Sequence, residues 1–109
     1  LVSKMKAHIE KNKVFTDPNL KLGDLADYLH ISTSRLSQIF RLYMHVNYYD
    51  FINAYRLKEF KRLVDEGMDK QYTITALSEQ CGFKRSNFFS TFRKSFGMTP
   101  VEYLKKMRE

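Results

Sequence analysis

Two stretches of the 109-residue chain carry basic and hydroxyl side chains but no carboxylate. The first lies between Asp27 and Asp50, the second lies between Glu79 and Glu102, and both have the same length. A solvated helix face normally mixes charges of both signs, so two such stretches indicate a surface that faces a polyanion. Their basic residues are Arg35 and Arg41 in the first stretch, and Lys84, Arg85, Arg93 and Lys94 in the second.

The overall charge agrees with a polyanionic partner. Nineteen Lys and Arg against twelve Asp and Glu give a formal net charge of +7. This excess of positive charge alone does not distinguish a nucleic acid from an anionic membrane surface as the partner. No unbroken apolar run approaches the ~20 residues of a membrane helix, so we expect this segment to make no membrane contact.

Enzymatic and metal-dependent functions find little support in the residue types. The single cysteine, Cys81, cannot form an internal disulfide, which fits a reducing cytoplasm, and its inward helical position predicts a buried, inert thiol. One Cys and three scattered His provide no metal-ligand spacing, and the serines lack a His–Asp partner arrangement. We therefore expect no catalytic activity, no metal and no cofactor.

The apolar residues recur every three and four positions, and only four Gly and two Pro are present, which predicts an all-α fold. Asn47, Thr73 and Thr99 are expected to cap helices, and Gly67 is expected to end one. Seven helices are predicted, over residues 2–13, 22–29, from 32 or 33 onward, 48–66, 74–81, 85–96 and 100–107.

An internal duplication becomes visible when the sequence is shifted by 52 residues. Leu25 then falls on Leu77, and the same shift pairs Ser34 with Ser86, Phe40 with Phe92 and Arg41 with Arg93. Each copy has the spacing of a helix-turn-helix, with a small residue, Ala26 or Ser78, where the second helix crosses. We expect one domain with a first helix-turn-helix subdomain (1–47), a long linker helix (48–66) and a second helix-turn-helix subdomain (67–109).

The second helix of each unit presents polar side chains that could read DNA. Only the exposed face of the first turns of a helix in the major groove reaches base edges. With Leu36, Phe40, Phe88 and Phe92 inward, the predicted base-reading residues are Ser34, Arg35, Ser37, Gln38, Arg85, Ser86, Asn87, Phe89 and Ser90. The predicted phosphate contacts are Arg41, Lys84, Arg93 and Lys94.

Several motifs resemble the DNA-binding domain of the AraC/XylS family of bacterial transcription regulators. They are Leu25-Ala26, Ser32 to Ser37, Phe40-Arg41, Arg56-Leu57, Cys81-Gly82-Phe83 and, most specifically, Phe92 to Pro100 followed by Tyr103. The resemblance covers residues 2–104 and implies seven helices, promoter binding and a role in activation. It also implies base reading by Ser34, Ser37, Gln38, Arg85, Ser86, Phe89 and Ser90. The chain departs from the family pattern at His45, Phe60 and Leu104.

The leading function is therefore sequence-specific binding of double-stranded promoter DNA in the bacterial cytoplasm, at the nucleoid. Because the chain begins at Leu1, we expect it to be part of a longer regulator with a ligand- or signal-sensing domain, and RNA polymerase is a further expected partner. Two alternatives remain open at this point. One is the DNA-binding unit of a recombinase or transposase, and the other is a helical protein-interaction module with a basic face. For Arg56, a structural role is favoured over a DNA contact.

Overall fold

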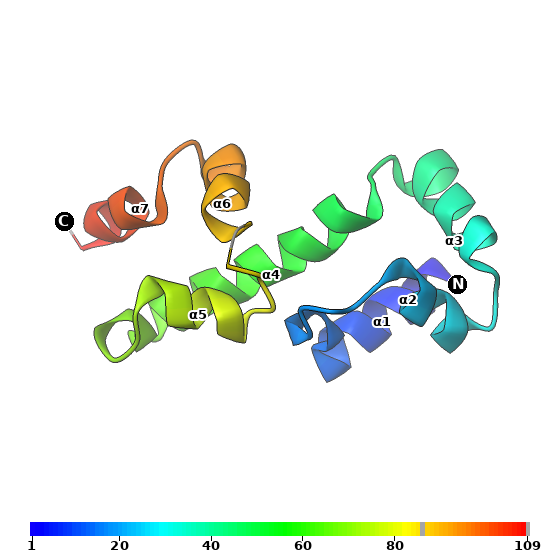
Figure 1. Cartoon of the computed structure of the whole chain (residues 1–109), viewed down its shortest axis with the longest axis horizontal. Helices are drawn as coiled ribbons and strands as arrows, with labels where there is room; N and C mark the ends of the chain where they lie inside the picture. The colour runs from blue at the N-terminus through cyan, green and yellow to red at the C-terminus, as the bar shows by residue number, and fades with distance from the viewer. Residues whose placement is uncertain (86, 109) are drawn as a thin grey trace.

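The computed structural model describes residues 1–85 and 87–108, and within these ranges every regular element is a helix (Figure 1). The molecule is elongated, with extents of 46 × 24 × 23 Å. None of the described helices is long and apolar enough to cross a membrane. The elements are α1 (Val2–Asn12), η1 (Val14–Thr16), α2 (Leu22–Leu29), α3 (Thr33–Ile39), η2 (Phe40–Met44), α4 (Tyr48–Asp65), η3 (Met68–Lys70), α5 (Ile74–Gln80), α6 (Phe88–Phe96) and α7 (Pro100–Met107).

Two separate hydrophobic cores form on the one long helix, α4. Its first half contributes Tyr48 and Ile52 to a core shared with α1, α2 and α3. Its second half contributes Leu57 and Phe60 to a core shared with α5 and α6, against which α7 packs. The predicted all-α architecture, with two helix-turn-helix units joined by a linker helix, is confirmed.

The predicted caps are present at three helix starts. The Asp50 N–H donates to Asn47 Oδ1 at 2.8 Å, and the Ala76 N–H donates to Thr73 Oγ1 at 3.0 Å. Thr99 and Glu102 form a reciprocal capping box at the start of α7. These bonds satisfy amide groups that a helix start leaves without partners, which explains why the sequence located these starts correctly.

The predicted start of α6 at residue 85 was wrong, because the helix begins at Phe88. In the first unit, Ser32 Oγ accepts the Arg35 N–H at 3.1 Å and starts α3 at Thr33. The position equivalent to Ser32 under the 52-residue shift is Lys84, whose side chain has no acceptor. The chain forms a turn there instead, closed by the Asn87 N–H on the Lys84 carbonyl at 3.0 Å.

Smaller differences occur at other helix ends. Helices α1, α4 and α5 each end one residue earlier than predicted. The first unit also continues from α3 into a π-helical turn, η2, which the sequence did not indicate and which ends at His45 in the left-handed region (φ 55°). His45 thus adopts a backbone conformation that usually favours glycine.

A buried arginine joins the two units. Arg56, on α4, donates from Nε to the Phe15 carbonyl at 2.7 Å and from Nη2 to the Asp17 carbonyl at 3.0 Å. The turn at Gly82 packs against the same loop. A Cβ added to Gly82 would lie only 2.1 Å from the Phe15 carbonyl oxygen. Arg56 is only 8% exposed, so the structural role favoured for it is confirmed.

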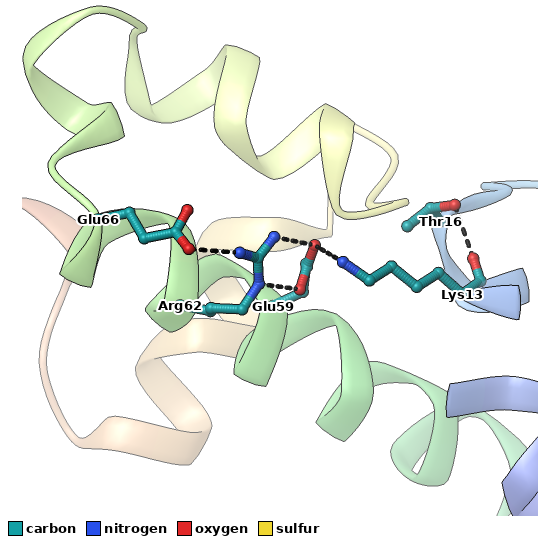
Figure 2. Close-up of polar contacts among 5 residues, drawn as sticks. All are labelled: Lys13, Thr16, Glu59, Arg62 and Glu66. Carbon is teal, nitrogen blue, oxygen red and sulfur yellow. Dashed lines mark hydrogen bonds and ion pairs between the residues drawn. The ribbon is translucent and has the colours of Figure 1, made fainter. Parts of the chain in front are cut away.

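An ion-pair network on α4 ties the same loop to the linker helix (Figure 2). Glu59 accepts from Lys13 Nζ at 3.1 Å and from both Nε and Nη2 of Arg62, while Arg62 Nη1 donates to Glu66 at 2.8 Å. The Glu59 side chain is 12% exposed. These hydrogen bonds lower the pKa of Glu59 to about 2, and the largest contribution comes from Arg62.

Glu59→Gln should lower the free energy of unfolding by about 2 kcal/mol at pH 7, because each unit of pKa shift corresponds to ~1.4 kcal/mol and the half-exposed partners are screened. The native pKa lies below the unfolded value, so this stability is complete above about pH 4.5 and is lost as the pH falls toward 2. Urea denaturation of both proteins between pH 2 and 7 measures it. The exposed Glu66→Gln is the control and should change stability by less than about 0.5 kcal/mol. Equal effects of the two variants would contradict the assignment.

Candidate nucleic-acid interface

The first group of predicted site residues lies on α3 and at the start of η2, which continues it. Leu36 and Phe40 are buried and set the rotation of this helix. All five predicted contacts of this unit are exposed as a result. They line an open depression of about 760 Å³, together with Leu22 and the residues that start α3. These five are Ser34, Arg35, Ser37, Gln38 and Arg41.

The second group divides between α6 and the turn that precedes it. Phe88 and Phe92 are buried, which leaves Phe89, Ser90, Arg93 and Lys94 exposed on α6. Phe89 is 46% exposed and meets the ring of Phe88 edge-on, with centroids 5.3 Å apart. Ser90 Oγ donates to the Asn87 carbonyl at 3.2 Å.

Three of the remaining predicted contacts of this unit lie outside a helix. Lys84, Arg85 and Asn87 are exposed and belong to the turn between α5 and α6. Ser86 lies outside the described residues. The second unit therefore offers a turn and a helix where the first unit offers one continuous helix.

The turns inside the two units differ in sequence but share a backbone conformation. His30 and Gly82 both have positive φ, 58° and 100°, at the end of the first helix of each unit. The small residues predicted beneath the crossing helices, Ala26 and Ser78, are 1% and 2% exposed. The two small residues are therefore buried in both units, as the sequence predicted.

A continuous surface joins the two units. The depression beside α3 shares Leu22, Ser37 and Arg41 with a second depression, which in turn shares Tyr48 with a third that reaches Lys84. Within residues 1–85 and 87–108, no Asp or Glu lines any of the three. Carboxylates lie elsewhere, as in the hollow beside Glu59. The basic residues of the first stretch, and Lys84 of the second, therefore line adjoining depressions.

Several polar residues on this surface were not among the predicted contacts, and they include Lys21, Tyr49 and Asn53. These three come from the loop before α2 and from α4, far from Lys84 in sequence. Only the fold brings them beside Lys84, so neither composition nor local spacing could have identified them.

The single cysteine does not contribute to this surface. Cys81 is fully buried in the second core, and burial raises the pKa of its thiol to about 12. The thiolate needed for redox chemistry is therefore absent at neutral pH, in agreement with the inert role predicted for it.

Comparisons with known proteins agree with the repeat and the fold. A family model described as "Helix-turn-helix domain" matches residues 25–106. The regulatory protein PocR of Salmonella typhimurium is 23% identical over 108 residues, which are 98% of this chain and 35% of that protein. The melibiose operon regulatory protein of Escherichia coli is 31% identical over 105 residues, 95% of this chain and 33% of that protein.

Solved structures share the same arrangement of helices. The C-terminal domain of AraT, a response regulator from Geobacillus stearothermophilus, superposes with a TM-score of 0.80 over 96% of this chain and 84% of that chain, at 21% identity. The chain spans about a third of the length of the two curated relatives described above.

Proposed function

The chain belongs to the AraC/XylS family of helix-turn-helix transcription regulators, in which it is the DNA-binding domain, and we propose that it reads two successive major-groove segments of promoter DNA. Helix α3 would enter one segment, and α6 with its preceding turn would enter the next. The observation that carries this proposal is the carboxylate-free surface shared by the two helix-turn-helix units.

The spacing of the two units suits a B-form duplex. Helix α4 has 18 residues and is therefore about 27 Å long at 1.5 Å per residue. This is of the same order as one DNA turn, about 34 Å, which separates successive major-groove segments on one face. Because the two units differ in sequence, the bound site should be asymmetric.

The exposed side chains suit separate tasks in the groove. Gln38 can pair bidentately with adenine and Arg85 with guanine, while the ring of Phe89 can pack on a thymine methyl. The other proposed base-reading residues are Ser34, Arg35, Ser37, Ser86, Asn87 and Ser90. Arg41, Lys84, Arg93 and Lys94 would hold phosphates and fix the register of the domain on the duplex.

The whole regulator is proposed to be larger than this chain. Its relatives are about three times as long, and we propose that the remaining part senses a ligand or signal and that the protein works in the cytoplasm, at the nucleoid. Transcriptional activation through contact with RNA polymerase is the proposed outcome. The family is one of DNA-binding regulators rather than an enzyme class, and its match does not favour a recombinase unit or a protein-interaction module.

Selection of bound sequences from random duplex DNA tests this proposal. We expect one asymmetric sequence with two recognition segments, bound by a single chain. A palindromic site that needs two copies of this domain would contradict the proposal, and so would the absence of any selected sequence.

The same selection with Phe89→Ala should relax the preference at one thymine position and lower affinity for the selected site by about 1–2 kcal/mol. An exposed ring on a basic helix has little folding role, so the melting temperature should stay nearly unchanged. Tyr72→Ala, which removes another exposed ring that lies on neither α3 nor α6, is the control and should leave both affinity and sequence preference unchanged. A large loss of stability with Phe89→Ala would show that the ring belongs to the core.

A further inference from the structure

The third of the joined depressions lies between the two units and encloses about 350 Å³. One side is the loop before α2, the floor is α4, and the other side is the turn that leads to α6. In Figure 1 the blue loop before α2 and the yellow turn after α5 lie next to each other, beside the middle of α4. The depression therefore occupies the space between the two recognition elements.

Four of its polar side chains offer hydrogen-bond donors to a ligand; Asn19, Tyr48, Arg56 and Asn87 also line it. Lys21 comes from the first unit and Lys84 from the second, and both are exposed. From α4, Tyr49 is 71% exposed and presents a hydroxyl. Asn53 Oδ1 accepts Arg56 Nη1 at 3.1 Å, so the amide nitrogen of Asn53, which can only donate, is the end left for a ligand.

Three aspartates lie within three residues of the lining in sequence, and each accepts a hydrogen bond. Asp50 accepts one from the Asn47 side-chain amide at 3.1 Å, and the other two accept from backbone amides. Asp17 Oδ1 accepts the Asn19 N–H at 2.8 Å, and Asp24 Oδ2 accepts the Lys21 N–H at 2.8 Å. None of these three aspartates lines the depression. Basic and neutral polar side chains line the depression, and no acidic residue among those described does, which suits a phosphodiester rather than a cation or an apolar ligand.

We propose that this depression binds the sugar–phosphate backbone of the DNA segment that separates the two major-groove segments. This inference rests on the proposed function. A duplex with successive major grooves against α3 and α6 must turn its intervening minor groove, and the backbone beside it, toward α4. Lys21, Tyr49 and Asn53 are therefore positioning residues that fix the register of the domain on the duplex and read no base.

The first test compares Lys21→Gln with Lys58→Gln on the selected duplex. Lys58 is also exposed but lies on α4 beside Glu10 and Glu59, in a different hollow. One lost phosphate contact flattens the plot of log affinity against log salt by about 0.9, which corresponds to about fivefold at 0.15 M salt. We expect this change for Lys21→Gln alone, with an unchanged selected sequence and an unchanged melting temperature.

The second test neutralises the DNA instead of the protein. Methylphosphonate linkages in the central segment of the site should weaken binding of the unsubstituted chain by about fivefold per lost contact. The same linkages should lower the affinity of Lys21→Gln by a smaller factor, because this variant already lacks one of the phosphate contacts. Asn53→Ala and Tyr49→Phe should likewise weaken binding without altering the selected sequence.

Two results would overturn the inference in distinguishable ways. If Lys21→Gln matches Lys58→Gln in affinity and salt dependence while the unsubstituted chain still selects one sequence, the backbone contact is wrong and the proposed function stands. If the unsubstituted chain selects no sequence from random DNA, the proposed function fails and the inference fails with it.

Discussion

Gly82→Ala should lower the free energy of unfolding by about 3–5 kcal/mol, although it adds only one methyl group. Gly82 has a φ of 100°, which side-chain-bearing residues rarely adopt. A Cβ at this position would lie 2.1 Å from the Phe15 carbonyl oxygen and 3.0 Å from the carbonyl carbon of Thr16. Both are backbone atoms, so no rotation of a side chain can relieve the contact.

The neighbourhood of Gly82 offers little room for adjustment. The same Cβ would lie 2.9 Å from Nε of Arg56, which is itself bonded to the Phe15 carbonyl at 2.7 Å. Moving the loop that carries Phe15 would break this buried hydrogen bond and leave polar groups without partners. Because the loop belongs to the first unit and Gly82 to the second, the variant should also displace the two recognition elements relative to each other.

Two other glycines provide matched controls. Gly67 and Gly97 also have positive φ, 80° and 72°, but an added Cβ would meet nothing within 4 Å at either position. Alanine at either position should lower the free energy of unfolding only by the backbone strain, about 1–2 kcal/mol. Urea denaturation of the three variants measures the difference. A loss for Gly82→Ala no greater than that for Gly97→Ala would show that the contact between the two units is not as close as described.

Gly82 also shows how far the sequence could predict this structure. A glycine between two helices favours a turn with positive φ, and Gly82 adopts one. The close approach of Phe15 could not be predicted, because nothing in the local sequence relates positions so far apart in the chain. The contact exists only after both cores have formed on α4.

The helices themselves were more predictable because their signals are local. Asn47, Thr73 and Thr99 each satisfy amides of their own helix, and apolar spacing sets which face of α3 is exposed. The start of α6 was misplaced because the periodic pattern extends over a turn that lacks a capping side chain at Lys84. Local patterns therefore predict helices and their faces, whereas a surface assembled from several segments requires the fold.

The affinity of the domain for its DNA site should fall about 1,000-fold when monovalent salt rises from 50 to 200 mM. Each phosphate contact releases counterions and contributes about −0.9 to the slope of log affinity against log salt. About six contacts, including Arg41, Lys84, Arg93 and Lys94, give a slope of roughly −5. These four side chains are all exposed, and no carboxylate among the described residues lines the joined depressions that would face the duplex.

Titration of a labelled duplex at several salt concentrations measures this slope, and paired variants assign it to the proposed surface. Arg41→Gln combined with Lys94→Gln should flatten the slope by about two, because each substitution removes one phosphate contact. Lys58→Gln combined with Lys61→Gln removes the same net charge from the exposed side of α4. If the slope depended on the net charge of +7 alone, both pairs would flatten it equally. Since the proposal places phosphates against one surface, only the first pair should flatten the slope. A slope near zero for the unsubstituted chain bound to DNA would refute a phosphate-facing surface.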